Sequence, residues 1–351
     1  MELTLSVFSQ PEFDNHEQVV FASDEATGLR AIIAVHNTNC GPAVGGCRFW
    51  NYDNDEQALI DVLRLSKGMT YKNALAGLNF GGGKAVIIGD PKKLKSEALF
   101  RAFGKKLNNL NGTYYSAEDV NITTGDIMQA YKETDYVVGL EGKSGNPAPF
   151  TAYGTYLGIK ASVKHKLGLD SLEGLTFAIQ GLGSVGMYLC ERLHAEKANL
   201  IVTDINAEAI DKAITQYGAK AVGLDDIYAV DADVYVPCAL GATINDKTIP
   251  LLNVKIVAGC ANNQLELPRH GQALKDNGIL YAPDYAINAG GIINIFFEQD
   301  PDGYSADKAN RKVEEIYDTL IEIFERSDRE NKPTHEVADL LAQEIIQRGQ
   351  K

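Results

Sequence analysis

The chain has 351 residues, of which 45% are hydrophobic and 23% charged, as is typical of a globular protein with room for two domains. Its formal net charge of −14 disfavours binding to nucleic acid, because phosphates select basic surfaces. The longest apolar runs are strand-sized, shorter than the ~20 residues of a membrane span, and no secretory signal pattern opens the chain. We therefore expect partners that are neither nucleic acid nor membrane.

The cysteines are odd in number and lie far apart, without a Cys-x-x-Cys pair. This pattern favours free thiols in a reducing compartment, and therefore a cytoplasmic protein, over a disulfide framework or a zinc site. We expect no metal. The five cysteines are Cys40, Cys47, Cys190, Cys238 and Cys260.

The first part of the chain predicts strands that alternate with helices. Expected strands cover residues 30–35, 85–88 and 112–117, and expected helices cover 55–67, 93–107 and 124–134. Gly68 is expected to end the first helix, and Thr124 is expected to cap the third. A stretch rich in Gly and Pro at 139–149 then predicts a hinge or cleft loop between domains.

The second part of the chain has a more regular pattern. Helices are expected at 151–165 and 185–195, strands at 175–180, 200–203, 234–237, 256–258 and 279–282, and two amphipathic helices at about 308–327 and 334–347. Strands separated by helices imply right-handed crossovers and a parallel sheet. We expect one domain at 1–145 and another at 146–330, with a C-terminal helix at about 330–351 that returns to the first.

A glycine motif joins the expected strand at 175–180 to the helix that follows. In Gly181-Leu-Gly183-Ser-Val-Gly186 the first glycine permits a tight turn, the second lets backbone approach a pyrophosphate, and the third lets helix pack on strand. Asp204 follows the next strand, where a carboxylate would bind the ribose hydroxyls of NAD and repel the 2′-phosphate of NADP. The alternative is a tight turn that binds no cofactor.

Two lysines twelve residues apart frame a second glycine motif. Lys84 follows Gly81-Gly-Gly83 directly, which would hold its amine beside backbone that a ligand can approach closely. Lysine is also the side chain whose pKa falls most readily on loss of water or near another cation. Lys72 could therefore hold an anionic group while Lys84 moves a proton. The alternative is a turn with two solvated lysines.

The lysine pair and the nucleotide motif occur in this order among several further motifs. With them, the chain resembles, over nearly its whole length, the amino acid dehydrogenase superfamily of glutamate, leucine, valine and phenylalanine dehydrogenases. The resemblance implies an α/β fold with an N-terminal substrate-binding and oligomerisation domain, a C-terminal Rossmann dinucleotide-binding domain and a cleft between them. The motifs are Gly41-Pro-Ala-Val44-Gly-Gly46, Lys67-Gly-Met-Thr-Tyr-Lys72, Gly81-Gly-Gly-Lys84, Ala117-Glu-Asp119-Val, Gly181-Leu-Gly-Ser-Val-Gly186, Cys260-Ala-Asn262-Asn263-Gln264 and Pro283-Asp-Tyr-Ala-Ile-Asn288-Ala-Gly-Gly291.

The resemblance also implies roles for individual residues. Lys72 would bind the substrate α-carboxylate, Lys84 would be the catalytic base, and Asp119 would exchange protons with the amine, unless Asp119 only caps the next turn. NAD would be bound by Thr151, Gly181, Gly183, Ser184, Val185, Gly186, Asp204, Cys238, Ala239, Asn262 and Asn288. The substrate pocket would further include Val44, Gly45, Gly46, Met69, Ala117, Asn288, Ile292 and Ile295.

The implied reaction is the reversible oxidative deamination of an L-amino acid to a 2-oxo acid and ammonia. Hydride leaves Cα, water attacks the iminium that remains, and a base must activate that water. Lysine stands at position 44 in glutamate-specific relatives, whereas Val44 here favours an apolar substrate, since an unpaired carboxylate against valine would be penalised. The bulk of Ile292 and Ile295 suits leucine, isoleucine or valine.

Three alternatives stay open at this point. Residues 120–123 (Val-Asn-Ile-Thr) and Asn79-Phe80 resemble the branches specific for phenylalanine or tryptophan, so an aromatic substrate is the second choice. A catalytically silent NAD-binding protein is disfavoured by the intact Lys72, Lys84 and Asp119. A hydroxy acid dehydrogenase would use a histidine as its base. None of the six histidines lies in a glycine-rich motif like that of Lys84, so this alternative is disfavoured. As in the relatives, we expect a homo-oligomer, from a dimer to an octamer.

Overall fold

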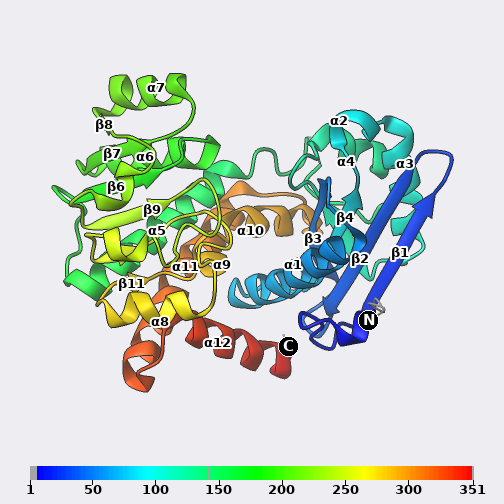
Figure 1. The fold of residues 1–351 in the computed structure, drawn as a ribbon. Helices are drawn as coiled ribbons and strands as arrows, with labels where there is room; N and C mark the ends of the chain where they lie inside the picture. Colours follow the sequence, from blue (N-terminus) through cyan, green and yellow to red (C-terminus); the bar gives the residue numbers. More distant parts are fainter. Residues whose placement is uncertain (1–5, 141, 350–351) are drawn as a thin grey trace. The chain divides into compact units, whose positions relative to one another are not determined.

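The computed structural model of the chain describes residues 6–140 and 142–349. The chain folds into two compact units (Figure 1). Unit 1 comprises Met1–Gly145, Glu298–Tyr304 and Ala342–Lys351, and unit 2 comprises Asn146–Phe297 and Ser305–Leu341. Among the described helices, none is long and apolar enough to cross a membrane.

Unit 1 is built on a five-stranded mixed sheet with the order β1-β2-β4-β3-β5. β1 pairs antiparallel with β2, and β2 pairs antiparallel with β4, whereas β3 is parallel to both β4 and β5. β1 and β3 were not expected from the sequence, and in β3 two glycines and an arginine interrupt the apolar run. The strands are β1 (Gln18–Asp24), β2 (Leu29–Asn37), β3 (Ala43–Trp50), β4 (Gly81–Ile88) and β5 (Tyr114–Ala117).

Helices cover both faces of this sheet. α1 (Asp55–Leu75) packs Leu59 and Val62 on one face, against Ile32 and Val86 of the strands. A second core on the other face joins the strands to α3 (Glu97–Asn108) and α4 (Thr124–Tyr131), with the short α2 (Pro91–Leu94) preceding α3. The sheet of unit 1 is thus the middle layer of three.

Two helix boundaries in unit 1 differ from the sequence expectation. α1 does not end at Gly68 but continues to Leu75, because its buried face continues through Thr70 and Ala74. A mid-helix glycine costs only about 1 kcal/mol relative to alanine, which packing of this face offsets. The cap of α4 is Thr123 rather than Thr124, in a reciprocal capping box with Asp126.

Unit 2 contains the expected parallel sheet. Its order is β11-β10-β9-β6-β7-β8, and every strand pair in it is parallel. The strands are β6 (Thr176–Gln180), β7 (Asn199–Thr203), β8 (Lys220–Ala221), β9 (Val234–Pro237), β10 (Ile256–Val257) and β11 (Leu280–Tyr281). The strand order reverses at β6, which has β7 on one side and β9 on the other, and ligands of such sheets bind at this switch point.

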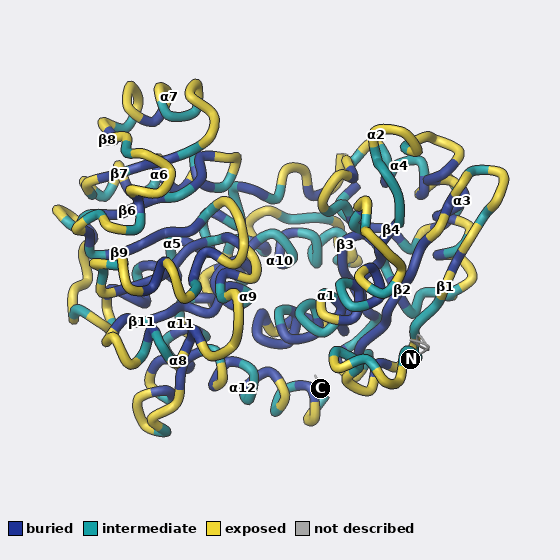
Figure 2. The backbone as a smooth tube through the Cα atoms, viewed as in Figure 1, coloured by how far each residue is buried: buried dark blue, intermediate teal, exposed yellow. Residues whose placement is uncertain are grey.

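The helices of unit 2 differ in how deeply they are buried. Figure 2 shows α7 largely exposed, whereas β6 and β9 are buried. The interior helix α5 has glycines where other elements come close, since a Cβ at Gly154 would lie 2.6 Å from Ile316 Cδ1. The helices are α5 (Ala148–Leu167), α6 (Ser184–Ala195), α7 (Ala207–Tyr217), α8 (Arg269–Asp276), α9 (Asp284–Ile287), α10 (Gly290–Phe296), α11 (Ala306–Glu330) and α12 (Thr334–Arg348), of which α12 continues into unit 1 from Ala342 onward. Short 3-10 turns lie at Val7–Ser9, Asp226–Ala229, Ile249–Leu251 and Phe297–Gln299.

Two segments late in the chain belong to unit 1, and side-chain hydrogen bonds anchor both. Glu298 accepts a hydrogen bond from the backbone N–H of Gly139, with an N–O distance of 2.9 Å. Gln343 donates to the hydroxyl of Tyr71 on α1, also at 2.9 Å. Contacts between residues 159 and 272 positions apart in sequence therefore complete this unit.

Candidate active site

A largely buried ion pair in unit 1 joins β4 to the loop that follows β5. The Nζ atom of Lys84 is 2.9 Å from Oδ2 of Asp119, and the Lys84 side chain is only 8% exposed. Lys84 belongs to β4, and Asp119 follows the end of β5 by two residues. The two acid–base groups that the sequence assigned to catalysis are therefore in direct contact.

This contact requires a residue without a side chain in β3, the strand that lies between β4 and β5. β3 separates β4 from β5, and its Gly46 is level with Ala117 of β5. A Cβ atom at Gly46 would lie 2.9 Å from the Cβ of Asp119 and 2.4 Å from the carbonyl oxygen of Glu118. Gly46, which the sequence assigned to the substrate pocket, thus leaves the room that Asp119 occupies.

The three glycines before Lys84 have a different role from the one expected. They belong to β4, so Lys84 lies within a strand and not just before one. A Cβ atom at Gly82 would lie 2.1 Å from the backbone nitrogen of Thr70 on α1, and one at Gly83 would lie 2.6 Å from the ring of Tyr114. Thr70 and Tyr114 pack directly against these two glycines. The expectation that the backbone there is left open for a ligand was therefore wrong.

A network that the sequence analysis missed lies behind Asp119. The Nε atom of Arg48 is 3.5 Å from Asp119 Oδ2, and its Nη1 atom is 2.9 Å from Asp61 Oδ2 on α1. Tyr52 donates a hydrogen bond to the same Asp61 oxygen at 2.6 Å. Arg48 stands two residues after Gly46 in β3, so both lie on one face of the strand. Had β3 been predicted from the sequence, this spacing would have indicated that Arg48 lies near the site.

Burial and charge act in opposite directions on Asp119. Burial raises the pKa of this carboxyl. The positive charges of Lys84 and Arg48 and the hydrogen bond from Lys84 lower the pKa by more than burial raises it, so the net shift is downward. Asp119 is therefore ionised at neutral pH. An ionised carboxylate beside Lys84 can accept a proton.

The other residues assigned to substrate binding in unit 1 lie on three elements. Lys72 is half-buried in the last turn of α1, so the two lysines lie on different elements and not in one glycine turn. Val44 is fully buried in β3 and Ala117 is buried in β5. Met69 of α1 lies over β3, because a Cβ atom at Gly45 would be 3.0 Å from its Cγ atom.

In unit 2 the glycine motif forms the expected turn between β6 and α6. Gly181 has a φ angle of +103°, which side chains rarely adopt, and a Cβ atom at Gly186 would lie 2.1 Å from the carbonyl oxygen of Gly181. A Cβ atom at Gly183, by contrast, would meet no described atom within 4 Å. α6 begins at Ser184, so Ser184 and Val185 contribute free N–H groups next to this open position. A pyrophosphate fits this arrangement.

Asp204 lies beside the glycine turn at the end of β7. Its Oδ2 atom accepts a hydrogen bond from the backbone N–H of Leu182 at 2.5 Å, and Oδ1 accepts one from Asn206 at 2.7 Å. The carboxylate thus stabilises the turn from the neighbouring strand, at the position where a ribose would lie in a Rossmann domain.

Three asparagine and cysteine residues meet near the ends of the neighbouring strands of unit 2. The side-chain nitrogen of Asn288 donates to Asn262 Oδ1 at 2.8 Å and to the carbonyl of Cys260 at 3.0 Å. Oδ1 of Asn288 is buried and has no hydrogen-bond partner among the described residues. A buried acceptor without a partner costs free energy unless a ligand donor satisfies it, so Asn288 suits a group that carries an N–H.

The remaining assigned residues of unit 2 lie around this group of side chains. Cys238 and Ala239 directly follow β9, next to the glycine turn, since a Cβ atom at Gly181 would be 2.7 Å from that of Ala239. Thr151 lies in the first turn of α5, and its hydroxyl is 2.9 Å from the position of a Cβ at Gly291. Ile292 and Ile295 are half-buried on α10.

Comparison with known proteins extends over the whole chain. Residues 15–140 match the family model described as Glu/Leu/Phe/Val dehydrogenase, dimerisation domain, and residues 202–349 match that of Glutamate/Leucine/Phenylalanine/Valine dehydrogenase. The chain is 54% identical over 347 residues to leucine dehydrogenase of Bacillus cereus, covering 98% of this chain and 94% of the relative. Identity to leucine dehydrogenase of Geobacillus stearothermophilus is 53% over 350 residues, covering 99% and 95%.

A solved structure supports the same relationship. L-tryptophan dehydrogenase from Nostoc punctiforme matches with a TM-score of 0.85 and 45% identity, covering 95% of this chain and 96% of that one. The family models and the relatives confirm the resemblance inferred from the motifs in the sequence. The chain is an amino acid dehydrogenase and belongs to the glutamate, leucine, phenylalanine and valine dehydrogenase family.

Proposed function

We propose that this protein catalyses the NAD-dependent, reversible oxidative deamination of leucine, valine and isoleucine to the 2-oxo acid and ammonia. The observation that carries the proposal is the buried contact of Lys84 with Asp119, 2.9 Å apart. A lysine and a carboxylate at this distance can pass a proton between them, as the loss of an amine requires.

Each catalytic residue has a separate task in this proposal. Lys72 binds the α-carboxylate of the substrate through its charge. Bound NAD supplies the hydride acceptor for the Cα hydrogen. Lys84 then takes a proton from the attacking water and passes it to the ionised Asp119, which gives it to the departing amine, and the same transfers run backwards in the reverse direction. Because Lys84 is 8% exposed, few water molecules compete for its proton.

The preference for a branched apolar side chain rests on Val44 and on the relatives. Val44 is fully buried and provides no charge for the side-chain carboxylate of glutamate. The leucine dehydrogenases named above are 53–54% identical to this chain, against 45% for the tryptophan dehydrogenase structure. An aliphatic substrate is therefore better supported than an aromatic one.

The preference for NAD rests on unit 2. Asp204 stands at the end of β7 and brings a negative charge that the 2′-phosphate of NADP would meet. Gly183 leaves space for a pyrophosphate, and Asn288 holds an unsatisfied acceptor for a group with an N–H. We further propose that 1–145 is the substrate domain, 146–330 the NAD domain and about 330–351 a return to the first, and that the chain forms a homo-oligomer, since residues 15–140 match a dimerisation domain.

One assay tests the proposed function. NADH formation is measured with a panel of L-amino acids and in parallel with NADP. The highest kcat/KM is expected for leucine, valine or isoleucine with NAD. Faster turnover of phenylalanine or tryptophan would replace the aliphatic proposal by the aromatic one, strong activity on glutamate would contradict the argument from Val44, and preference for NADP would contradict that from Asp204.

Replacing Arg48 with methionine should change the pH dependence of the reaction. The loss of this positive charge, 3.5 Å from Asp119, raises the pKa of Asp119. Because Asp119 acts in its ionised form, the acidic limb of kcat/KM should move to higher pH by about 1 unit. Arg30→Met is the matched control. Arg30 also lies on a strand and forms an ion pair with an aspartate of α1, but both side chains of that pair are exposed. An unchanged acidic limb in Arg48→Met would show that Arg48 does not set the charge state of Asp119.

A further inference from the structure

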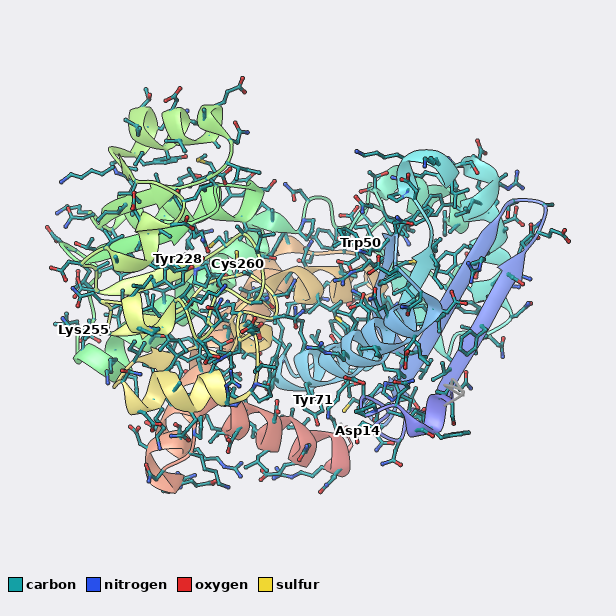
Figure 3. The ribbon with its side chains drawn as sticks, viewed as in Figure 1. Asp14, Trp50, Tyr71, Tyr228, Lys255 and Cys260 are labelled. Carbon is teal, nitrogen blue, oxygen red and sulfur yellow. The ribbon has the colours of Figure 1, made fainter. Side chains whose placement is uncertain are left out.

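Two thiols of unit 2 lie next to each other at the ends of neighbouring strands. β9 and β10 are parallel, with Val234 opposite Ile256 and Tyr235 opposite Val257. Beyond these pairs, Cys238 follows β9 directly, and Cys260, which is labelled in Figure 3, comes three residues after the end of β10. Neighbouring strands lie about 4.8 Å apart, within the Cα separation of about 4.4–6.8 Å that a disulfide spans.

The pairing of the two strands slips by one residue at Cys260. The N–H of Ala258 still donates to the carbonyl of Tyr235 at 3.0 Å, but the next bond to β9 comes from Ala261, which donates to Pro237 at 2.9 Å. The sulfur of Cys238 accepts hydrogen bonds from the backbone N–H and from the thiol of Cys260. Cys238 receives two hydrogen bonds from one residue.

These hydrogen bonds make the thiol of Cys238 more acidic than an ordinary cysteine thiol. The bond from the Cys260 side chain and the weaker bond from its backbone lower the pKa of Cys238, although burial acts to raise it. Burial raises the pKa of the Cys47 thiol and raises that of Cys190 to about 12. Cys238 and Cys260 are only partly buried, whereas Cys40, Cys47 and Cys190 are buried. A lowered pKa with access to solvent is typical of reactive cysteines.

The thiol pair is continuous with the dinucleotide turn. The backbone N–H of Cys238 donates to Gln180, the last residue of β6, at 2.7 Å. A Cβ atom at Gly181 would lie 2.9 Å from the carbonyl carbon of Cys238, and one at Gly186 would lie 3.6 Å from its Cβ. The N-terminus of α6 is thus close to Cys238 and favours negative charge there.

We propose that Cys238 and Cys260 form an oxidation site, at which a hydroperoxide converts the two thiols into a reversible disulfide that weakens dinucleotide binding. The thiolate of Cys238 attacks the hydroperoxide, so that an S–O bond forms, the O–O bond breaks and an alcohol or water leaves. The sulfur of Cys260 then attacks Cys238, the S–S bond forms, the S–O bond breaks, and water leaves with the proton of Cys260. Two thiols are oxidised and one peroxide is reduced.

The disulfide would act on the residues that follow each cysteine. Ala239 follows Cys238 next to Gly181, and Asn262 stands two residues after Cys260 in contact with Asn288. Linking the two cysteines replaces their hydrogen bonds with a covalent bond and shifts these neighbours. Bound NAD should in turn shield both thiols. The effect on activity rests on the proposed function, but formation of the disulfide does not.

The full-length protein is treated with hydrogen peroxide, with and without NAD, and alkylated, and its disulfides are mapped by mass spectrometry. A Cys238–Cys260 link is expected, with a several-fold loss of NADH affinity measured by fluorescence, reversal by dithiothreitol and protection by NAD. Cys260→Ser, which removes only the second thiol, is compared with its own activity and NADH affinity before treatment. After peroxide it should carry an irreversibly oxidised Cys238 that dithiothreitol does not restore. Cys40→Ser, which removes a buried thiol, should behave like the original protein.

The outcomes separate this inference from the proposed function. A mapped link in a protein that turns over no amino acid would contradict the proposed function alone. An active enzyme in which both thiols survive peroxide, or in which Cys238 links to another cysteine, would overturn the oxidation site alone. A link that forms without change in NADH affinity would overturn its effect on the dinucleotide.

Discussion

Replacement of Lys84 with alanine is expected to lower kcat for leucine oxidation by about 10³-fold or more, because general base catalysis contributes about 10²–10⁴-fold. The variant should still bind NADH, since the glycine turn belongs to unit 2 and Lys84 to unit 1. Steady-state kinetics with leucine and NAD, together with NADH titration by fluorescence, measure the two effects separately. A near-normal kcat would remove Lys84 from the mechanism.

The loss of Lys84 also removes one of the positive charges that balance the largely buried carboxylate of Asp119. Among the described cations that pair with Asp119, Arg48 would remain, at 3.5 Å, so the variant should unfold at a lower temperature. Lys84→Met combined with Asp119→Asn removes both charges and should recover stability without activity. Lys95→Ala provides a control, because Lys95 forms a comparable pair with Asp126, 2.5 Å apart, elsewhere in unit 1. It should lose stability but keep kcat.

Replacement of Gly183 with alanine should weaken NADH binding without destabilising the fold. A Cβ atom there meets no described atom within 4 Å, and the φ angle of −65° suits any residue. The described residues leave this space open, so under the proposed function a methyl group there would meet the bound pyrophosphate and not the protein. Overpacking by one methyl costs about 1–3 kcal/mol, which corresponds to an affinity lower by about 5- to 150-fold. Titration of NADH fluorescence and thermal unfolding measure the two quantities.

A second glycine in a helical setting provides the control for this change. A Cβ atom at Gly125 in α4 would be 3.7 Å from Thr123 Oγ1, an ordinary contact, so Gly125→Ala should leave both NADH affinity and stability unchanged or slightly improve stability. Equal NADH affinity in Gly183→Ala and the original protein would contradict the assignment of the pyrophosphate to the turn between β6 and α6.

The sequence alone predicted well where local pattern and motif agree. The strands at 175–180, 200–203 and 234–237 nearly coincide with β6, β7 and β9, because continuous apolar runs between helices define a buried parallel sheet. The end of α1 was misplaced, since a local signal such as Gly68 is weaker than the packing of a buried face. β3 was missed because its two glycines hide the strand pattern.

The sequence by itself determined the family of this protein and the glycine turn at Gly181, and it singled out Lys72, Lys84 and Asp119 as candidates for the chemistry. Only the tertiary structure decided how that chemistry is arranged. The strand order β4-β3-β5 places Gly46 where Lys84 and Asp119 must meet, and it brings Arg48 against Asp119. Sequence spacing contains no record of strand order, because pairing between distant segments is set by the burial of whole faces and not by any local pattern.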